Sequence, residues 1–424
     1  MDTQKQPTRS IVTLTHTPHG HTLHHNRIFS KDGQWLVFDG RNEETKIGET
    51  SLIGMVHVRT GEERVLYTTD NPSLFGPGVG AASFSPTQDR VVFIHGLVDA
   101  DETSPYAIGR RTGVAVDIEQ PQQPIYLDAR DVSIPYTAGT LRGGTHGHCW
   151  SGDGRLLSFT YNDEQVEPDL RVVGVLVPSE ADMSVDEVKG NQRGTMYAAI
   201  VSDVVADPRP GSDQIQKAFD ECWVGEHGYI QADGSCVPYA VAFQGNTVDK
   251  DGASVTEIFI VDIDVEQIKA DVGAVGRKGE RPSVPHGIRQ RRLTHSGGFS
   301  TLRYWLRSSR DGQYIFALMK DVQLYNQIVR CDVLSGEVVF VTQLTSSISS
   351  PFNVDQEGVL FVFVVDNKIV VFDYLNDNYI YLTDEMHGLV GAPSFSPDGT
   401  TVVFNQFVRS DNGHSYIQIK QVSC

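Results

Sequence analysis

The stretch Phe395-Ser396-Pro397-Asp398-Gly399, followed by Val402-Val403-Phe404, decides the fold of this chain. It reads as the end of one strand, a tight turn in which Asp and Gly tolerate the reversal, and a second strand of alternating apolar residues. The same phrase recurs along the 424 residues. Close copies contain the turns that start at Ser30, Ser85, Ser151, Ser309 and Asp355, and a degenerate copy starts at Gln231. A unit of this size cannot bury its apolar face alone, so neighbouring units must stack on one another.

The repeat predicts an all-β fold, a single seven-bladed β-propeller. Each unit reads as four antiparallel strands with an alternation suited to a sheet stacked between two neighbours. The third strand often ends in Asp, as at Asp262, Asp332 and Asp373. The outer strand finishes in Leu-Thr or a close variant, at Tyr67-Thr68, Leu293-Thr294, Leu344-Thr345 and Leu382-Thr383.

The two ends of the chain predict how the ring closes. The last unit stops after its third strand, and the strand at residues 11–15 carries the same finish, Leu14-Thr15. Pairing this N-terminal strand into the last blade as its outer strand removes an exposed edge. We therefore expect one domain over residues 1–424, with blades near 27–68, 81–128, 146–204, 226–294, 302–345, 350–383 and 392–421 plus 11–15.

The insertions fall in the middle of the chain. One runs from Asp203 to Val224, where the segment Ser212–Phe219 predicts a short helix capped by Ser212. The other is the glycine- and arginine-rich stretch from Gly273 to Ile288. Long loops on a rigid ring commonly carry function, although such loops also change length neutrally.

Composition narrows the class of partner. The net charge of −19 repels nucleic acid and anionic lipid, so we expect neither as a partner. Five widely spaced cysteines without a C-x-x-C pair indicate free thiols in a reducing compartment. The first residues lack the apolar core of a signal peptide, and the longest apolar run, Val359 to Val365, is too short to span a membrane. The prediction is a cytoplasmic protein.

Several histidines precede the expected inner strands and would converge on the central channel: His24, His25, His146, His148, His227 and, a few residues earlier, His387. His146-Gly147-His148 in an extended strand would put both imidazoles on one side, as a metal requires. We predict a divalent ion, Mn²⁺ or Zn²⁺, held by His146, His148, His25 and His227. The alternative is a polar channel lined with water. His16, His19 and His21 are interpreted as loop histidines.

The segment Arg303-Tyr304-Trp305-Leu306-Arg307 opens the expected inner strand of the fifth blade. Alternation sends the two arginines and Trp305 to one side and Tyr304 to the other. Arginine can hold a carboxylate with two parallel hydrogen bonds, and an aromatic ring can stack on a sugar face. We predict Arg303, Tyr304, Trp305 and Arg307 as ligand-binding residues, with packing between blades as the alternative. No catalytic residue is identified. The chain lacks a Walker A loop and a G-x-S-x-G nucleophile motif.

The Phe-Ser-Pro-Asp-Gly phrase, its Val-x-Phe strand and the Leu-Thr finish resemble the TolB-type (PD40) propeller repeat over essentially the whole chain. The pattern also resembles the YidR-type propellers and, more distantly, the oligogalacturonate lyases. The lyase resemblance implies a divalent metal held by histidines and a glutamine in the central cavity, and cleavage of galacturonides by β-elimination. His146-Gly147-His148 matches that family's His-x-His pair before an inner-strand turn. The family's remaining ligands and its base match no motif here.

Two functions from different classes follow. The first is binding of a small anionic ligand, such as an acidic sugar, in the central cavity, with metal-assisted, lyase-like chemistry if the protein is an enzyme. The second is a non-catalytic scaffold that binds a protein or peptide across one face. Histidines and arginines converging on the cavity would favour the first, and a broad exposed apolar patch would favour the second.

Overall fold

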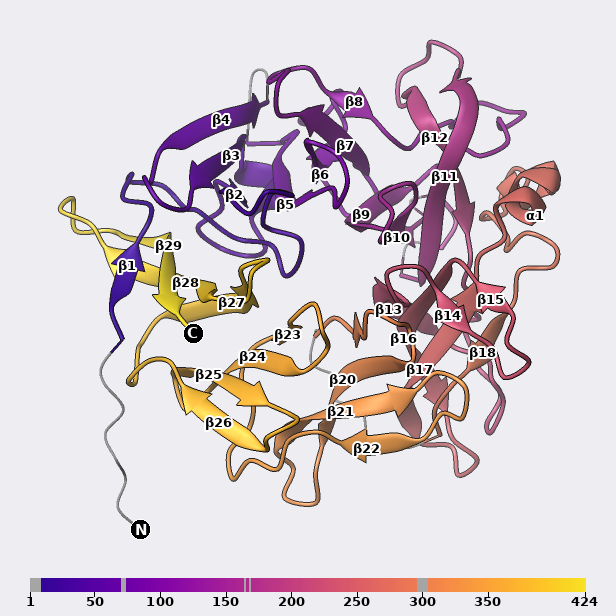
Figure 1. The fold of residues 1–424 in the computed structure, drawn as a ribbon. Helices are drawn as coiled ribbons and strands as arrows, with labels where there is room; N and C mark the ends of the chain where they lie inside the picture. The colour runs from indigo at the N-terminus through magenta and orange to yellow at the C-terminus, as the bar shows by residue number, and fades with distance from the viewer. Residues whose placement is uncertain (1–8, 70–73, 164, 168, 296–303) are drawn as a thin grey trace.

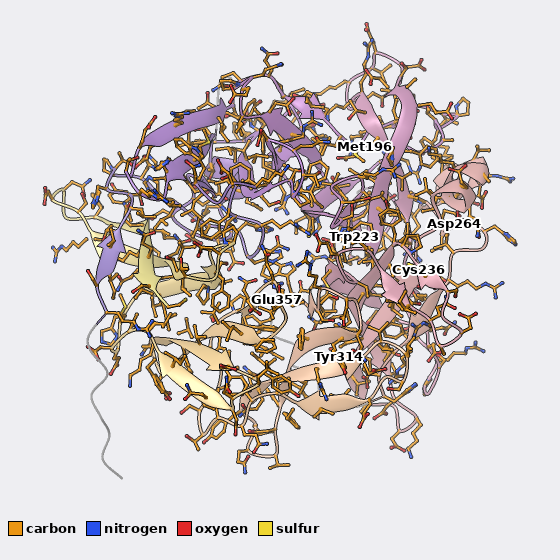
Figure 2. All side chains as sticks on the ribbon, in the orientation of Figure 1. Met196, Trp223, Cys236, Asp264, Tyr314 and Glu357 are labelled. Atoms are coloured by element: carbon orange, nitrogen blue, oxygen red, sulfur yellow. The ribbon has the colours of Figure 1, made fainter. Side chains whose placement is uncertain are left out.

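The computed structural model describes residues 9–69, 74–163, 165–167, 169–295 and 304–424. Seven antiparallel sheets stand around a common axis as blades, and a further two-stranded sheet, β14–β15, is inserted in one of them (Figure 1). The predicted all-β seven-bladed propeller is confirmed. Within the described ranges the helical elements are short: α1 (Val265–Ala270), η1 (Ile47–Glu49) and η2 (Val272–Val275). Asp264 caps α1 at the rim of the ring by accepting the amides of Glu266 and Gln267 (Figure 2).

The first three blades occupy the N-terminal half of the ring. The first contains β2 (Trp35–Asp39), β3 (Leu52–His57) and β4 (Glu63–Thr68), with an inner segment bridged to β2 at Phe29 and Leu36. The second contains β5 (Val79–Phe84), β6 (Arg90–Gly96), β7 (Arg111–Asp117) and β8 (Ile125–Tyr126). The third contains β9 (Gly144–Trp150), β10 (Leu157–Asn162), β11 (Arg171–Met183) and β12 (Gly194–Ile200).

The remaining four blades complete the ring. The fourth contains β13 (Lys217–Trp223), β16 (Ala240–Val248), β17 (Ser254–Asp262) and β18 (Gln290–Arg292), with the hairpin β14 (Tyr229–Ile230) and β15 (Cys236–Val237) inserted after β13. The fifth contains β19 (Arg307–Ser308), β20 (Tyr314–Lys320), β21 (Asn326–Asp332) and β22 (Val338–Phe340). The sixth contains β23 (Asn353–Val354), β24 (Leu360–Val365), β25 (Lys368–Asp373) and β26 (Asn378–Tyr381). The seventh contains β27 (Leu389–Phe395), β28 (Thr401–Arg409), β29 (Ser415–Ser423) and β1 (Ile11–Thr13).

The repeated turn joins the inner and second strands through one set of hydrogen bonds. In the third blade, Ser151 Oγ donates to Asp153 Oδ1 at 2.7 Å and accepts the Leu156 amide at 3.0 Å. Gly154 follows with φ of 70°, a conformation that glycine adopts at little cost. Equivalent Ser-to-Asp bonds occur at Ser30, Ser309 and Ser396. The sequence motif is thus a side-chain network that fixes the reversal.

A second repeated bond ties the outer strand to the third strand. The Thr294 hydroxyl accepts the Ile258 amide, and Thr383 accepts Ile369 in the same way. In the fifth blade the acceptor is Thr342, which bonds Ile328. The predicted finish at Leu344-Thr345 was therefore placed three residues too late, because the hydroxyl must lie beside the third strand to reach its amide.

The predicted closure by the N-terminal strand is confirmed. β1 pairs antiparallel with β29, with Ile11 opposite Val422 and Thr13 opposite Lys420. Leu14 donates its amide to Ile419 O at 2.8 Å. Thr15 accepts the Ile419 amide at 2.9 Å, which is the same outer-strand bond that the other blades make.

The apolar core lies between blades rather than at the axis. Separate buried clusters fill the interfaces, for example around Phe84 and Phe93 between blades one and two, and around Phe361 and Phe363 between blades five and six. Another cluster, with Leu14, Phe38 and Ile419, joins blade seven to blade one. Each blade is held by the two neighbours that cover its faces.

The inner strands of several blades carry a bulge close to the axis. The register against the second strand shifts in β5, β9, β13 and β27. A residue with positive φ stands at each shift: Ala81 at 57°, Gly147 at 71°, Asp220 at 53° and Gly391 at 69°. Bulges turn the strand and re-aim the side chains that follow them.

The predicted helix at Ser212–Phe219 is wrong, because β13 begins at Lys217 and is the inner strand of the fourth blade. Ala218 and Ile215 are fully buried against neighbouring strands, and this tertiary burial outweighs the local helix signal. Ser212 instead lies in a turn, where its hydroxyl donates to Arg209 O. The degenerate turn at Gln231–Gly234 is the tip of the β14–β15 hairpin.

No helix in the described part of the chain combines the length and the apolar character that a membrane span requires.

Replacing Ser151 by alanine tests the turn network. The Ser151→Ala change removes the acceptor of the buried Leu156 amide and the donor to Asp153, so we expect the free energy of unfolding to fall by about 1–2 kcal/mol. Urea unfolding followed by tryptophan fluorescence measures this. As a matched control, Ser410→Ala in the β28–β29 turn should stay within about 0.5 kcal/mol of the wild type. If both changes lowered the free energy of unfolding equally, the stabilising role assigned to the Ser151 turn network would be contradicted.

Candidate functional site

The histidines of the first blade meet the fifth blade near the axis. His24 and His25 are both buried. The His25 ring stacks on Trp305, with ring centroids 3.8 Å apart and an interplanar angle of 8°. His24 approaches His25 edge-on at 4.1 Å. Burial, reinforced by Arg41, Arg307 and His148, lowers the pKa of His24 to about 3, so its imidazole is neutral at neutral pH.

Arg307 connects the blades that meet at the axis. Its Nε donates to Asn353 Oδ1 at 2.7 Å, Nη1 donates to Leu306 O at 2.9 Å, and Nη2 donates to His25 O at 2.9 Å. Asn353 in turn donates to Ser394 Oγ at 2.7 Å. Each guanidinium nitrogen is bonded within the protein. We therefore assign Arg307 to the architecture of the axis and not to the predicted carboxylate clamp.

The other residues predicted to bind a ligand have separate environments. Trp305 packs on His25, as described above. Tyr304 packs against the cluster between blades five and six, and its carbonyl oxygen accepts Gln244 Nε2 at 2.7 Å. Arg303 lies outside the described residues.

His146 and His148 flank the bulge of β9. Because Gly147 has φ of 71°, the triplet is not the extended strand that the sequence prediction assumed. His148 Nε2 lies 3.1 Å from Thr145 Oγ1 and 4.0 Å from Asp128 Oδ1. Burial lowers the pKa of His148 to about 3 and raises that of Asp128 to about 6. These groups form a polar contact between blades two and three.

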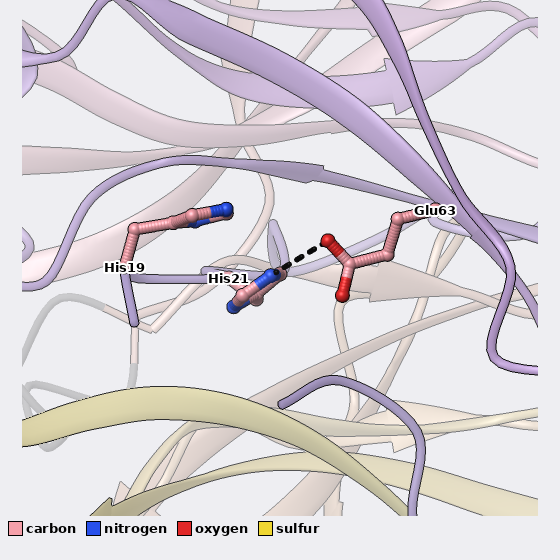
Figure 3. Close-up of side chains that lie close together, drawn as sticks. All are labelled: His19, His21 and Glu63. Carbon is pink, nitrogen blue, oxygen red and sulfur yellow. Dashed lines mark hydrogen bonds and ion pairs between the residues drawn. The ribbon is translucent and has the colours of Figure 1, made fainter. Parts of the chain in front are cut away.

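The four histidines predicted as metal ligands do not come together as one set. His227 follows β13 instead of preceding it, so it is exposed at the turn end of the fourth blade, whereas His25 and His148 are buried near the axis. Within the described ranges, one group of three side chains offers ligand atoms within 4.8 Å of one another: His19, His21 and Glu63 (Figure 3). The predicted ligand set therefore does not fit a single ion.

Glu221 is a buried carboxyl that the sequence prediction missed. It follows Asp220 at the bulge of β13, and desolvation raises the pKa of Glu221 to about 8. The sequence prediction placed this position in the insertion from Asp203 to Val224, outside any inner strand. At neutral pH the carboxyl is mostly protonated, so it acts as a neutral hydrogen-bonding group.

A pocket of about 520 Å³ opens at the turn end of blades five and six. Its floor contains Arg330, whose guanidinium lies 4.7 Å from the Tyr314 ring centroid and 5.6 Å from that of Tyr374. Figure 2 labels Tyr314 and Glu357, two residues of its wall. We call this cavity the Arg330 pocket. His227 lines its rim, which is the one contact between this pocket and the predicted site residues.

The charged side chains of the Arg330 pocket differ in whether they have partners within the protein. Arg310 lies 2.5 Å from Glu226 and 3.8 Å from Glu357. Asp311 accepts the Ser309 hydroxyl and the Gln313 amide. The Arg330 guanidinium has neither a hydrogen bond nor an ion pair with any residue that the structure describes, although the backbone of Arg330 pairs within its sheet. The sequence signal for it was a single arginine that interrupts the apolar strand Ile328-Val329-Arg330-Cys331.

The Glu221→Gln change tests the buried carboxyl. Its pKa rises from 4.5 to about 8 on folding, so between these values the folded protein holds a proton that the unfolded chain has lost. The contribution of Glu221 to stability is therefore full below pH 4.5 and is lost as the pH rises to 8. We expect the wild-type urea midpoint to fall more steeply than that of Glu221→Gln between about pH 5 and pH 8.5. The exposed control Glu119→Gln should follow the wild type, and parallel curves for wild type and Glu221→Gln would contradict the burial effect.

Comparisons with known proteins agree with the fold. Residues 78–192 match the model of a family described as a protein of unknown function (DUF3748). The chain is 34% identical over 409 residues to the uncharacterized protein YidR of Escherichia coli (strain K12), covering 92% of this chain and 94% of YidR.

The solved structures that resemble this chain have low sequence identity to it. An oligogalacturonate lyase in complex with manganese has a TM-score of 0.54 at 14% identity, covering 100% of this chain and 98% of the lyase. TolB from Acinetobacter baumannii has a TM-score of 0.40 at 13% identity, covering 92% of this chain and 80% of TolB. The resemblances to the YidR-type propellers and to the fold of the lyase are confirmed. The lyase comparison shows the fold alone.

Proposed function

The chain belongs to the YidR family, and within this seven-bladed fold we propose that it binds a small carboxylate-bearing ligand, an acidic sugar, in the Arg330 pocket. The observation that carries the proposal is the unpaired Arg330 guanidinium between two tyrosine rings in the part of the pocket that the structure describes. The proposal keeps the anionic ligand expected from the sequence and moves it from the axis to the turn face.

The chemistry of the pocket suits such a ligand. A guanidinium offers a planar pair of donors to a carboxylate, and a charge-assisted hydrogen bond contributes about 1.5–3 kcal/mol. Tyr314 and Tyr374 keep the Arg330 side chain in one orientation, so little entropy is lost when it binds. Tyrosine rings also present the flat apolar surface on which the C–H face of a sugar stacks.

The neighbouring side chains suit a ligand that carries hydroxyl groups beside its carboxylate. Arg310 is engaged by Glu226 and Glu357, which leaves Arg330 as the cation open to a ligand carboxylate. The carboxylates at the rim, Glu357 and Asp311, can accept hydrogen bonds from hydroxyl groups. A uronic acid carries both groups on one ring.

Two other functions, ligand binding at the axis and protein binding across one face, have weaker support. The axis, where the sequence suggested the ligand, has its arginine bonded within the protein. A protein-binding scaffold is favoured by the β20–β21 turn, where Val322 and Leu324 are 92% and 71% exposed. Two side chains on one turn supply far less surface than the roughly 800 Å² that each partner buries in a stable complex.

We also propose a cytoplasmic location. The five cysteines are free thiols in the structure, and Cys149, Cys222 and Cys331 are buried. Disulfides form and persist in oxidising compartments, whereas free cysteines suit a reducing one.

Substitution of Arg330 tests the proposed ligand. Galacturonate and trigalacturonate should bind to the wild type in calorimetry, and neutral galactose should not. The Arg330→Gln change should weaken uronate binding at least about tenfold, since it removes one charge-assisted contact. The control Arg64→Gln removes an exposed arginine that also stacks on an aromatic ring, Trp35, far along the chain. Uronate binding that survives in Arg330→Gln, or equal binding of galactose, would refute the proposal.

A separate assay decides whether binding leads to β-elimination. With oligogalacturonide added, lyase chemistry would raise the ultraviolet absorbance of the unsaturated uronate product. If the absorbance follows the same time course with and without protein, the protein binds the ligand without cleaving it.

A further inference from the structure

Four side chains meet at the seam where the ring closes. Thr17 Oγ1 lies 3.0 Å from His19 Nε2 and 3.0 Å from His21 Nε2. It lies 3.2 Å from Glu63 Oε2, and His21 Nε2 lies 3.3 Å from that same oxygen. Figure 3 shows the two histidine rings beside one another with the Glu63 carboxylate directed at His21. Two nitrogens and two oxygens thus converge within hydrogen-bond distance of Thr17.

The ligand atoms of His19, His21 and Glu63 all lie within 4.8 Å of one another, and the two rings, stacked with centroids 4.2 Å apart, must turn toward a shared ion to bind it. Donors bound at about 2.0–2.2 Å around a tetrahedral ion lie about 3.4 Å from one another. We propose that His19, His21, Glu63 and the Thr17 hydroxyl form a binding site for a divalent transition-metal ion, with Zn²⁺ as its simplest occupant, that clamps the N-terminal closing strand to the first blade. Two imidazoles and a carboxylate are a donor set that zinc accepts readily.

A backbone contact orients the His19 ring. His19 Nδ1 lies 2.9 Å from Gly20 O. A carbonyl only accepts, so Nδ1 donates to Gly20 O, and this contact directs Nε2 of the ring toward Thr17. This contact is also the kind that orients metal-bound histidines.

The backbone holds the set in place from both sides of the seam. The His21 amide donates to Ile417 O on β29 of blade seven. On the other side, a Cβ added to Gly20 would lie 1.9 Å from Arg41 O of blade one, so the chain is pressed against that blade. Gln418 Nε2 donates to Thr17 O at 3.0 Å. An ion can enter from solvent, because Thr17 is exposed and His19 is partly exposed.

The expected consequence is a tighter ring closure. The ligands Thr17, His19 and His21 follow β1 directly, while Glu63 begins β4 of blade one. An ion bound to all of them links the chain end that pairs with β29 to the neighbouring blade. Because an ion that binds only the folded state stabilises it by mass action, zinc should raise the melting temperature.

The test uses untagged, chelator-treated full-length protein titrated with ZnCl₂. We expect about one bound zinc per chain by elemental analysis after desalting, and a rise in melting temperature of several degrees. The His19→Ala and Glu63→Gln variants should bind zinc at least about tenfold more weakly and lose the rise. His16→Ala is the matched control, because this exposed histidine lies outside the set. The fully buried His21 is left intact, since its replacement could unfold the seam.

Hydrogen exchange of the amides of residues 11–15 measures the clamp directly. Zinc should slow this exchange in the wild type and in His16→Ala, and should leave it unchanged in His19→Ala and Glu63→Gln. Absence of stoichiometric zinc in the wild type, or wild-type affinity in the variants, overturns the site. Zinc binding that leaves the exchange unchanged overturns the clamp. The Arg330→Gln change should alter none of these results, so failure here and failure of the ligand proposal are distinguishable.

Discussion

The pairing of β1 with β29 is the constraint on which the rest of the structure depends. Each blade buries its apolar faces only against its neighbours, so a ring left open would expose two such faces to water. The closure uses the Leu14 amide on Ile419 O and the Thr15 hydroxyl on the Ile419 amide. The cluster of Leu14, Phe38 and Ile419 then fills the last interface. Residues from the two ends of the chain therefore share one core.

Closure of the ring also determines how the polar groups at the axis are hydrogen-bonded. Seven sheets that converge on one line bring polar side chains of distant segments into a crowded, buried space, where each donor needs an acceptor. Arg307, Asn353 and the backbone of His25 meet that requirement by bonding to one another. The axis consequently joins the blades. Arg330, whose guanidinium lacks a partner among the described residues, lies in the pocket that residues of blades five and six line.

The sequence predicted those features that depend on short-range chemistry. The Ser-x-Asp-Gly motif can be recognised in the sequence because Ser151, Asp153 and Gly154 make their bonds within one turn. The number of blades follows from counting such turns, and the closing strand follows from the finish that Leu14-Thr15 shares with the other outer strands. The inner strand of the fourth blade, β13, was not predicted, because an inserted hairpin separates it from its turn. Only tertiary burial marks Lys217–Trp223 as a strand. The partners of Arg307, Asn353 and His25, belong to other blades, so no local pattern indicates these contacts.

The two His-Gly-His triplets show why a metal motif could not be read from spacing alone. In His146-Gly147-His148 the glycine makes a left-handed bulge, and the second histidine turns toward Thr145 in a buried contact between blades. In His19-Gly20-His21 the glycine lets the chain lie against the Arg41 carbonyl, and both rings face Thr17 and Glu63. The deciding carboxylate is 42 residues away along the chain and comes close only after the ring has closed. The contacts made where the ring closes therefore allow His19 and His21 to act as the proposed metal ligands. His146 and His148 make structural contacts between blades instead.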